Sequence, residues 1–195
     1  MKQQDQKNKV ILSLFDYSGN WPRYYKENGY DVYSLDIKYD IDILTITRED
    51  LHDGIYGILA APPCTDFSGS GAQYWKIKDE DGRTAQSLAL VDKVLEIISW
   101  YPEPHFWALE NPVGRLSTLR PQLGKPWYFQ PHWYGDPYTK KTGIWGNFNK
   151  DLPRNDVAPD PNSWIMKLGG KSEKTKELRS MTPLGFAKAF YEANR

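Results

Sequence analysis

The chain has 195 residues, a length that predicts one domain large enough to bury a core without disulfides or structural metals. Its 25 basic and 25 acidic residues cancel, so the overall charge gives no indication for or against nucleic-acid binding. The one cysteine, Cys64, excludes an internal disulfide and favours a reducing, intracellular setting.

Metal and membrane proteins are two further classes that the sequence does not favour. The three histidines do not lie at ligand spacing from one another, so we expect no metal site. No apolar run approaches the roughly 18 residues that a membrane span needs, and the polar start MKQQDQKNK lacks the apolar region of a signal peptide. We therefore expect a cytoplasmic protein with no membrane partner, in which residues 1–9 are flexible.

The first elements are typical of the front half of a nucleotide-binding βαβ unit. Residues 10–15 predict a buried strand, Pro22 suits the first turn of a helix over 23–28, and a second strand over 30–35 ends at Asp36. In such units the acid after the second strand commonly binds ribose hydroxyls. The turn after the first strand has one glycine instead of the usual three, so an ordinary surface turn is the alternative.

Cys64 follows a strand that two prolines bring to an end. Residues 58–61 are apolar and predict a buried strand, and neither Pro62 nor Pro63 can donate to a sheet ladder. The thiol therefore lies at the carboxyl end of a strand, where open α/β sheets bind ligands. We consider it a candidate nucleophile, and the alternative is a buried structural cysteine.

A carboxylate is predicted at the same edge of the sheet. Residues 69–82 predict a mobile loop, and from Thr84 apolar residues recur at helical spacing over about 15 residues. Residues 106–109 then predict a short buried strand that ends at Glu110. Because one crossover helix joins the two strands, their carboxyl ends meet at one edge. The alternative for Glu110 is a loop or helix-capping carboxylate.

The following stretch is less regular. Residues 114–133 are rich in proline and predict no regular element, and residues 134–148 predict a hairpin arm that carries Lys140 and Lys141. Exposed lysines are ordinary on a hairpin, so their presence alone indicates little.

The last part of the chain predicts a loop and a helix. Residues 149–176 are charged and interrupted by prolines, with one possible strand over 164–168. A closing helix over 183–194 has Thr182 as its cap. Its apolar residues at helical spacing predict a buried face made of Phe186, Ala189 and Phe190.

Four motifs resemble those of the cytosine-C5 DNA methyltransferases. Residues 62–68, PPCTDFS, resemble the P-P-C-x-x-F-S catalytic motif, and residues 110–113, ENPV, resemble the E-N-V motif. Residues 14–19, LFDYSG, are similar to the first cofactor motif, L-F-x-G-x-G, and residues 179–183, RSMTP, to the closing N-S-V-x-P motif. The order and spacing agree as well. The resemblance extends over most of the chain from Val10 to Gly146 and over its last seventeen residues.

This resemblance implies a fold, a cofactor and a substrate. The fold is the class I methyltransferase fold, a Rossmann-like α/β fold with a mostly parallel sheet and helices on both faces, formed by one domain. The cofactor is S-adenosylmethionine and the substrate is DNA. The cofactor-binding residues that the resemblance implies are Phe15, Asp16, Tyr17, Ser18, Gly19, Asp36, Asp42, Pro62, Arg179, Ser180 and Thr182.

The resemblance also implies a mechanism. The Cys64 thiolate adds to C6 of cytosine, which makes C5 nucleophilic enough to attack the methyl group of the donor. Glu110 is a protonated acid held against ring N3 and the exocyclic amine, and burial is expected to raise its pKa. Lys140 and Lys141 stand nearest to the position at which the family has an arginine close to O2, but a lysine cannot make the bidentate contact.

One departure from the family bears on the substrate. Family members carry a target-recognition domain before the closing motif, whereas here only about thirty residues separate Gly146 from Arg179. Recognition then comes from a partner, or the DNA is single-stranded, or specificity is minimal, as would suit a compact phage enzyme. Two alternatives stay open: the same chemistry on a free pyrimidine nucleotide, and a non-catalytic regulatory subunit, which the replacement of a cofactor-loop glycine by Tyr17 would suit.

Overall fold

The computed structural model describes residues 9–165, 167–168 and 172–195, so residues 1–8 of the expected flexible leader lie outside the described part. The strands are β1 (Val10–Leu14), β2 (Asp31–Leu35), β3 (Gly57–Ala60), β4 (Phe106–Pro112), β5 (Trp127–Phe129) and β6 (Thr142–Asn147). The α-helices are α1 (Arg23–Glu27), α2 (Trp75–Glu80), α3 (Arg83–Ser99), α4 (Leu116–Leu119), α5 (Glu173–Ser180) and α6 (Leu184–Ala193).

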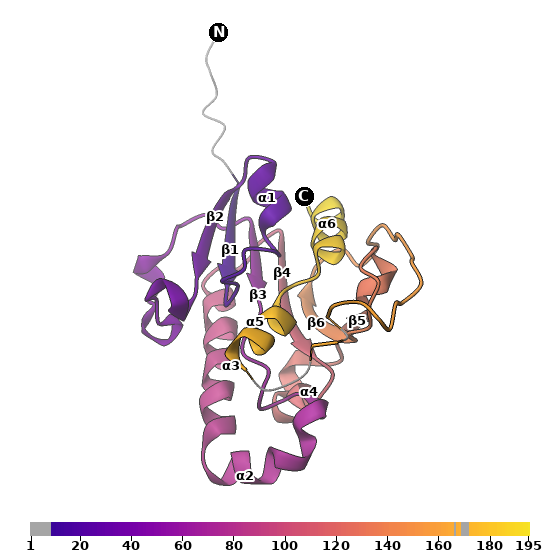
Figure 1. The fold of residues 1–195 in the computed structure, drawn as a ribbon. Coiled ribbons are helices and arrows are strands. Elements are labelled where there is room, and N and C mark those ends of the chain that lie inside the picture. The colour runs from indigo at the N-terminus through magenta and orange to yellow at the C-terminus, as the bar shows by residue number, and fades with distance from the viewer. Residues whose placement is uncertain (1–8, 166, 169–171) are drawn as a thin grey trace.

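All the strands form one six-stranded sheet in the order β2-β1-β3-β4-β6-β5 (Figure 1). β1 pairs in parallel with β2 and β3, and β3 pairs in parallel with β4. β6 runs antiparallel between β4 and β5. This mostly parallel sheet with its helices confirms the predicted α/β class and is consistent with the fold of S-adenosylmethionine-dependent methyltransferases.

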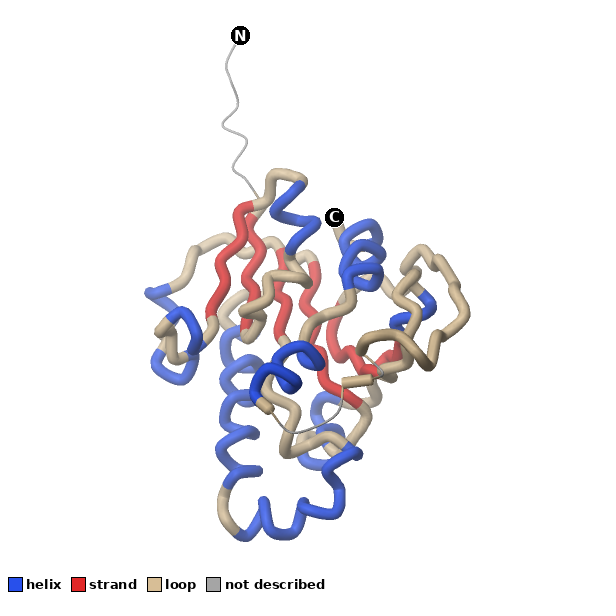
Figure 2. Tube along the Cα trace, viewed as in Figure 1, coloured by secondary structure: helices blue, strands red, loops and turns tan. Residues whose placement is uncertain are grey.

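Helices cover both faces of the sheet, which is why β1 and β3 are buried along their whole length (Figure 2). On one face, Leu12 and Ile58 pack in one apolar cluster with Val91 of α3. On the other face, Ile11 packs in a second cluster with Phe190 of α6. Full burial of one such side chain contributes about 1.5–3 kcal/mol to the free energy of unfolding. Strands in the centre of the sheet are buried on both faces, and their sequences are therefore continuous apolar runs.

The segment after Cys64 is helical, which corrects the predicted mobile loop over residues 69–82. Gly69–Tyr74 forms a 3₁₀ helix, and α2 follows it directly and packs against α3. Lys78 of α2 is only 6% exposed and reaches back to the residues that follow Cys64. This long-range ionic contact orders a segment whose composition is typical of a loop.

The predicted hairpin arm over residues 134–148 is wrong. β6 enters the sheet between β4 and β5, and it buries Ile144 and Trp145, which a surface hairpin would expose. Its partner β5 lies in the stretch 114–133, for which the sequence predicted no regular element, and so does α4. The pairing is antiparallel and long-range, so neither strand carries a local turn signal.

The C-terminal part differs from the prediction at three points. α5 begins inside the predicted loop, and residues 164–168 form turns and no strand where they are described. Pro183 occupies the N-cap position of α6, so Thr182 is not its cap. Thr182 is buried instead, and its carbonyl accepts a hydrogen bond of 3.1 Å from Asn20 Nδ2. The predicted buried face of α6 is confirmed at Phe186, Ala189 and Phe190.

A close backbone approach between β4 and β6 gives a test of the corrected topology. Gly146 has φ of +144°, and a Cβ there would lie 2.0 Å from the carbonyl oxygen of Trp107. We expect Gly146→Ala to lower the free energy of unfolding by more than about 2 kcal/mol, as strain and steric clash in a buried strand do. Denaturant unfolding measures the change. Gly54→Ala is the control, because nothing lies within 4 Å of a Cβ at Gly54; equal effects of the two substitutions would contradict the observed pairing.

Candidate active site

A cavity of about 1180 Å³ opens at the carboxyl edge of the parallel strands. Its walls come from the loops after β1, β2 and β3, from the carboxyl end of β4, from the segment before β6, and from α5 with the residues that follow it. The 3₁₀ helix over 69–74, α2 and α3 complete the lining. In doubly wound α/β folds this edge is where ligands bind.

Most of the predicted site residues line this one cavity. They are Phe15, Asp16, Tyr17, Ser18, Asp36, Asp42, Pro62, Cys64, Glu110, Lys140, Arg179, Ser180 and Thr182. Two predicted residues do not. Gly19 lines a separate groove of about 350 Å³ beside Arg23 and Lys26. The Nζ atom of Lys141 lies 4.5 Å from the ring centroid of Tyr128, away from the cavity lining.

Cys64 is held by its backbone in a tight turn. Its carbonyl accepts hydrogen bonds from Phe67 N at 3.0 Å and from Ser68 N at 2.9 Å. The pKa of the thiol is raised to about 11, chiefly because burial disfavours the thiolate and secondly because of the charge of Glu110, while Lys140 acts in the opposite direction. The resting group is thus a thiol, and ionisation needs compensating positive charge or a proton acceptor.

Glu110 lies near the carboxyl end of β4 and is 8% exposed. Burial raises the pKa of its carboxyl, and the charge of Asp16 adds to this effect. The ammonium of Lys140 opposes the shift, with Nζ at 3.8 Å from Oε1 of Glu110. Burial therefore favours the protonated carboxyl, the form that can donate a hydrogen bond to a ring nitrogen.

Lys140, and not Lys141, faces the cavity because of the register between β4 and β6. Thr142 pairs with Pro112 in the antiparallel ladder, so the residues just before β6 lie beside the carboxyl end of β4. The backbone is fixed there by a bond of 3.0 Å from Lys140 N to Gln130 Oε1, and by a bond of 2.9 Å from Thr142 Oγ1 to the carbonyl of Lys140. Sequence spacing alone could not separate the two lysines.

The side chain of Asp16 holds the loop after β1 together by accepting hydrogen bonds from residues of the same loop. Oδ1 of Asp16 accepts from the hydroxyl of Ser18 and from Gly19 N, and Oδ2 accepts from Trp21 N at 3.0 Å. Phe15, just before it, has φ of +61°, a left-handed conformation that costs a bulky residue about 1–3 kcal/mol and is typical of ligand sites. Asp16 therefore shapes the loop, and both of its oxygens are already in use.

The two acids after β2 are differently arranged. Asp36 accepts from Lys38 N at 2.9 Å and Asp42 accepts from Leu44 N at 3.0 Å, each through Oδ1. Each Oδ2 has no hydrogen-bond partner within the part of the chain that the structure describes. Both residues line the cavity, so each presents one carboxylate oxygen that is able to accept from a ligand hydroxyl or amine.

α5 crosses the cavity and is tied to the loop after β2. Lys38 Nζ lies 2.7 Å from Oε1 of Glu177, and the same ammonium lies 4.6 Å from the ring centroid of Tyr17. The Tyr17 ring packs on Tyr39 at 5.1 Å and is 44% exposed. The bulky residue in the predicted cofactor loop is thus accommodated against Tyr39 and Lys38. Arg179 on α5 is exposed at the cavity wall.

Several residues at the site carry no sequence signal that we recognised. Lys38, Glu177 and Lys78 line the cavity, yet they belong to no motif and their partners are remote in sequence. Asn111 is different, because it lies inside the ENPV motif: its Nδ2 donates to the carbonyl of Pro62 at 3.2 Å. Its place in that motif was the available indication.

Comparisons with known proteins show limited similarity. No protein-family description and no curated protein matches the chain. One similar solved structure is a prophage-encoded protein (E. coli) assigned as a DNA modification methyltransferase, with a TM-score of 0.48 and 19% identity over 85% of this chain. The chain spans 56% of the length of that neighbour.

The described part of the chain contains neither a membrane-spanning helix nor a metal-binding cluster. Among the described residues, no helix combines the length and apolar character needed to cross a bilayer. In the same part of the chain, no group of three or more His, Cys, Asp or Glu residues is arranged to hold a metal ion.

The burial of Glu110 predicts an unusual pH dependence of stability. Because folding raises the pKa of this carboxyl above its ordinary value of 4.5, the free energy of unfolding falls as the pH rises through the folded pKa. Gln cannot ionise, so we expect the melting temperature of Glu110→Gln relative to wild type to rise between pH 4 and pH 8. Thermal unfolding over this range measures the difference.

The control for that series is Glu103→Gln, because Glu103 is exposed near the start of the same strand. Its melting temperature relative to wild type should change little over the same pH range. A difference between Glu110→Gln and wild type that does not change with pH would contradict a raised pKa at Glu110.

Proposed function

We propose that this protein transfers a methyl group from S-adenosylmethionine to C5 of cytosine in DNA through a covalent adduct of Cys64. The observation that carries the proposal is the convergence of a thiol, a buried carboxyl and an ammonium on one wall of a single cavity. Cys64, Glu110 and Lys140 come from three separate segments, and each has the chemistry that addition to a pyrimidine requires.

Other residues of the cavity lining fit the donor. Asp36 and Asp42 each have one carboxylate oxygen able to accept from the ribose hydroxyls or the adenine amine, and Phe15, Ile37 and Pro62 supply apolar surface for the base. Arg179, Ser180 and Thr182 on the α5 side are expected to bind the amino-acid part of the donor, with the Arg179 guanidinium on its carboxylate. When bound, S-adenosylmethionine supplies an electrophilic methyl group.

The chain's own groups account for the activation of the pyrimidine. The Cys64 thiol loses its proton to solvent, and the sulfur forms a bond to C6 while the ring electrons move toward C5 and N3. Protonated Glu110 donates a hydrogen bond at N3 and stabilises the charge that collects there, and the Lys140 ammonium stabilises charge near O2. After C5 is methylated, the C5 proton passes to solvent and the C6–S bond breaks, which restores the aromatic ring. The expelled thiolate takes up a proton and becomes the resting thiol again.

A free pyrimidine nucleotide is the second candidate substrate. The observation that favours it is the stretch between β6 and α5, which within its described residues forms only turns and irregular chain and adds no recognition domain. On DNA, a base must leave the stack to reach such a cavity, and a recognition surface normally fills the gap. A single-stranded DNA or a recognition partner would remove that requirement.

Trapping with 5-fluorocytosine tests the mechanism. Fluorine at C5 cannot leave as the proton does, so methyl transfer should leave a covalent protein–DNA complex that survives denaturing electrophoresis. We expect the complex with wild type and S-adenosylmethionine, and none with Cys64→Ser. No complex on double-stranded DNA, single-stranded DNA or the nucleotide would contradict the proposal, and a complex on the nucleotide alone would favour the second candidate.

Calorimetry with S-adenosylmethionine separates the enzyme from a non-catalytic subunit. We expect binding to wild type and clearly weaker binding to the Asp36→Asn variant, because Asn replaces a charged acceptor by a neutral one. The absence of measurable binding to wild type would instead favour a regulatory protein that has the fold without the donor site.

The pair of neighbouring lysines gives a matched test of the charge near O2. We expect Lys140→Met to lower the rate of methyl transfer by about 100-fold, the effect of removing one preorganised charge from a buried site. Lys141→Met should change the rate by no more than about twofold, because Lys141 lies outside the cavity lining. Single-turnover methylation measures both, and equal losses would contradict the assignment of Lys140.

A further inference from the structure

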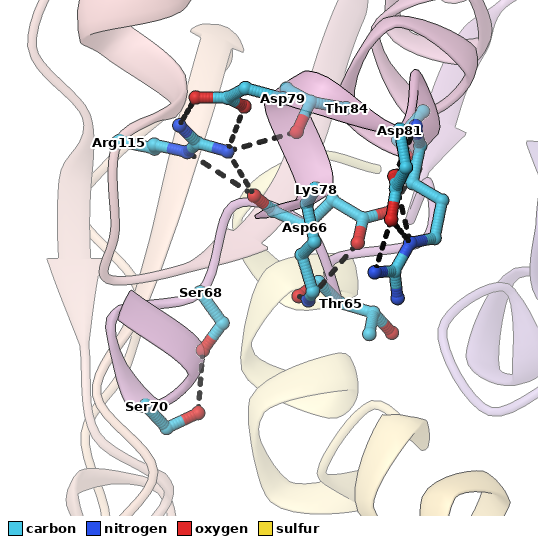
Figure 3. Close-up of polar contacts among 11 residues, drawn as sticks. Thr65, Asp66, Ser68, Ser70, Lys78, Asp79, Asp81, Thr84 and Arg115 are labelled. Carbon is cyan, nitrogen blue, oxygen red and sulfur yellow. Dashed lines mark hydrogen bonds and ion pairs between the residues drawn. The ribbon is translucent and has the colours of Figure 1, made fainter. Parts of the chain in front are cut away.

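A buried lysine contacts the Cys64 loop, which we define as residues 64–68. Lys78 Nζ donates to the carbonyl of Thr65 at 2.6 Å and lies 3.1 Å from Oδ1 of Asp66 (Figure 3). Oδ2 of Asp66 accepts from the hydroxyl of Ser87 at 2.6 Å. Burying an ammonium is costly, so the contacts with Thr65 and Asp66 must be well formed for Lys78 to remain there.

Arg115 holds the same loop from the other side. Its Nε and Nη2 donate to the carbonyl of Asp66 at 3.3 Å and 3.2 Å. The guanidinium is itself fixed by Asp79, to whose two oxygens it donates at 2.8 Å and 2.7 Å, and by Thr84 at 2.9 Å (Figure 3). Such a bidentate pair restricts orientation as well as distance. The carbonyls of both residues that follow Cys64 thus accept from cations.

The turn that carries Arg115 also runs against the loop through its backbone. Gly69 N donates to the carbonyl of Val113 at 2.9 Å, and Arg115 N donates to the carbonyl of Phe67 at 3.0 Å. This turn directly follows β4, the strand on which Glu110 lies. The loop with the thiol is therefore fastened to the end of the strand with the acid.

The thiol has little else to fix it. Among the described residues no other side chain forms a hydrogen bond with its sulfur, and Cys64 is fixed through the backbone of the loop. Any force that shifts the carbonyls of Thr65 and Asp66 shifts the sulfur as well. In a reaction whose rate depends on the placement of the attacking atom, a displacement of about 1 Å can cost about 100-fold.

We propose that Lys78 and Arg115 are positioning residues that hold the Cys64 loop against β4 and so set the place of the thiol beside Glu110 and Lys140. The effect on methyl transfer rests on the proposed function, whereas the effect on the thiol does not. The competing explanation is that Lys78 only neutralises Asp66 inside the fold. The two explanations predict different reactivity of the Cys64 sulfur when Lys78 is replaced.

The single cysteine makes the thiol directly measurable, because alkylation by iodoacetamide reports Cys64 alone. In Lys78→Met the loop loses the donor to Thr65 and the thiol gains access to water. Loss of burial, the largest cause of the raised pKa, outweighs the negative charge that Asp66 then keeps. We expect the apparent pKa of alkylation to fall from about 11 toward the ordinary value of a thiol, and alkylation at pH 8 to become about tenfold faster for each pKa unit. Lys76→Met is the matched control, since Lys76 is two residues earlier on α2 and its side chain is 88% exposed.

Loss of stability alone could also expose a thiol, so a second control is needed. Gly146→Ala is expected to destabilise the sheet at the end of β4 that is remote from Glu110. All rates are measured well below the melting temperature of each variant. Alkylation as fast in Gly146→Ala as in Lys78→Met, at similar stability, would overturn the proposal.

The double variant Lys78→Met with Asp66→Asn separates positioning from neutralisation. It removes both charges, so stability should recover relative to Lys78→Met, but Thr65 still lacks its donor and alkylation should stay fast. Recovery of both stability and slow alkylation would overturn the proposal. If Lys78→Met does not fold, Arg115→Lys replaces it, with Arg120→Lys as its control, because Arg120 pairs with Asp92 outside the network.

Trapping on 5-fluorocytosine DNA then tests the consequence for the reaction. We expect Cys64 in Lys78→Met to be alkylated faster than in wild type, and the variant to be trapped at least about tenfold more slowly. A displaced thiol is more accessible to the reagent but is poorly placed to attack the base. Unchanged alkylation and trapping in folded Lys78→Met would overturn the positioning role. If wild type is not trapped but the alkylation results hold, the proposed function fails and the positioning of Cys64 stands.

Discussion

The structure of the site depends on the convergence of two parallel strands that end side by side. β3 and β4 pair in register, and a buried hydrogen bond of 3.2 Å from the Asn111 amide to the carbonyl of Pro62 joins their carboxyl ends. Cys64 lies two residues after one partner of this bond and Glu110 lies one residue before the other. The proline that ends β3 exposes a carbonyl with no competing ladder partner, and the buried asparagine supplies its donor.

Burial at that point determines the electrostatics of the cavity. The pKa values of Cys64 and Glu110 are both raised chiefly by loss of water, so the resting state has a neutral thiol beside a carboxyl that favours its proton. Lys140 supplies the nearby positive charge, and it lowers both pKa values. Charge that develops on a ligand in such a site interacts strongly with these groups, because little water is present to screen it.

The remaining walls of the cavity are held together by contacts between remote segments. Lys38 joins the loop after β2 to Glu177 of α5, and Asn20 joins the loop after β1 to Thr182. On the opposite side Lys78 and Arg115 brace the Cys64 loop from α2 and from the turn after β4. The small size of the chain is thus compatible with a well-braced site.

The sequence by itself determined the α/β class, the central strands and the main helix, because continuous apolar runs and helical spacing report burial that any fold must satisfy. Most of the site residues that it predicted line the cavity, since prolines after strands mark the edge at which Cys64 and Glu110 meet. Only the tertiary structure decided that β6 inserts between β4 and β5, that Lys140 and not Lys141 reaches Glu110, and that the segment after Cys64 is helical. Antiparallel register and the buried Lys78–Asp66 pair are long-range, and local composition does not encode which remote partner a strand or a charge will find.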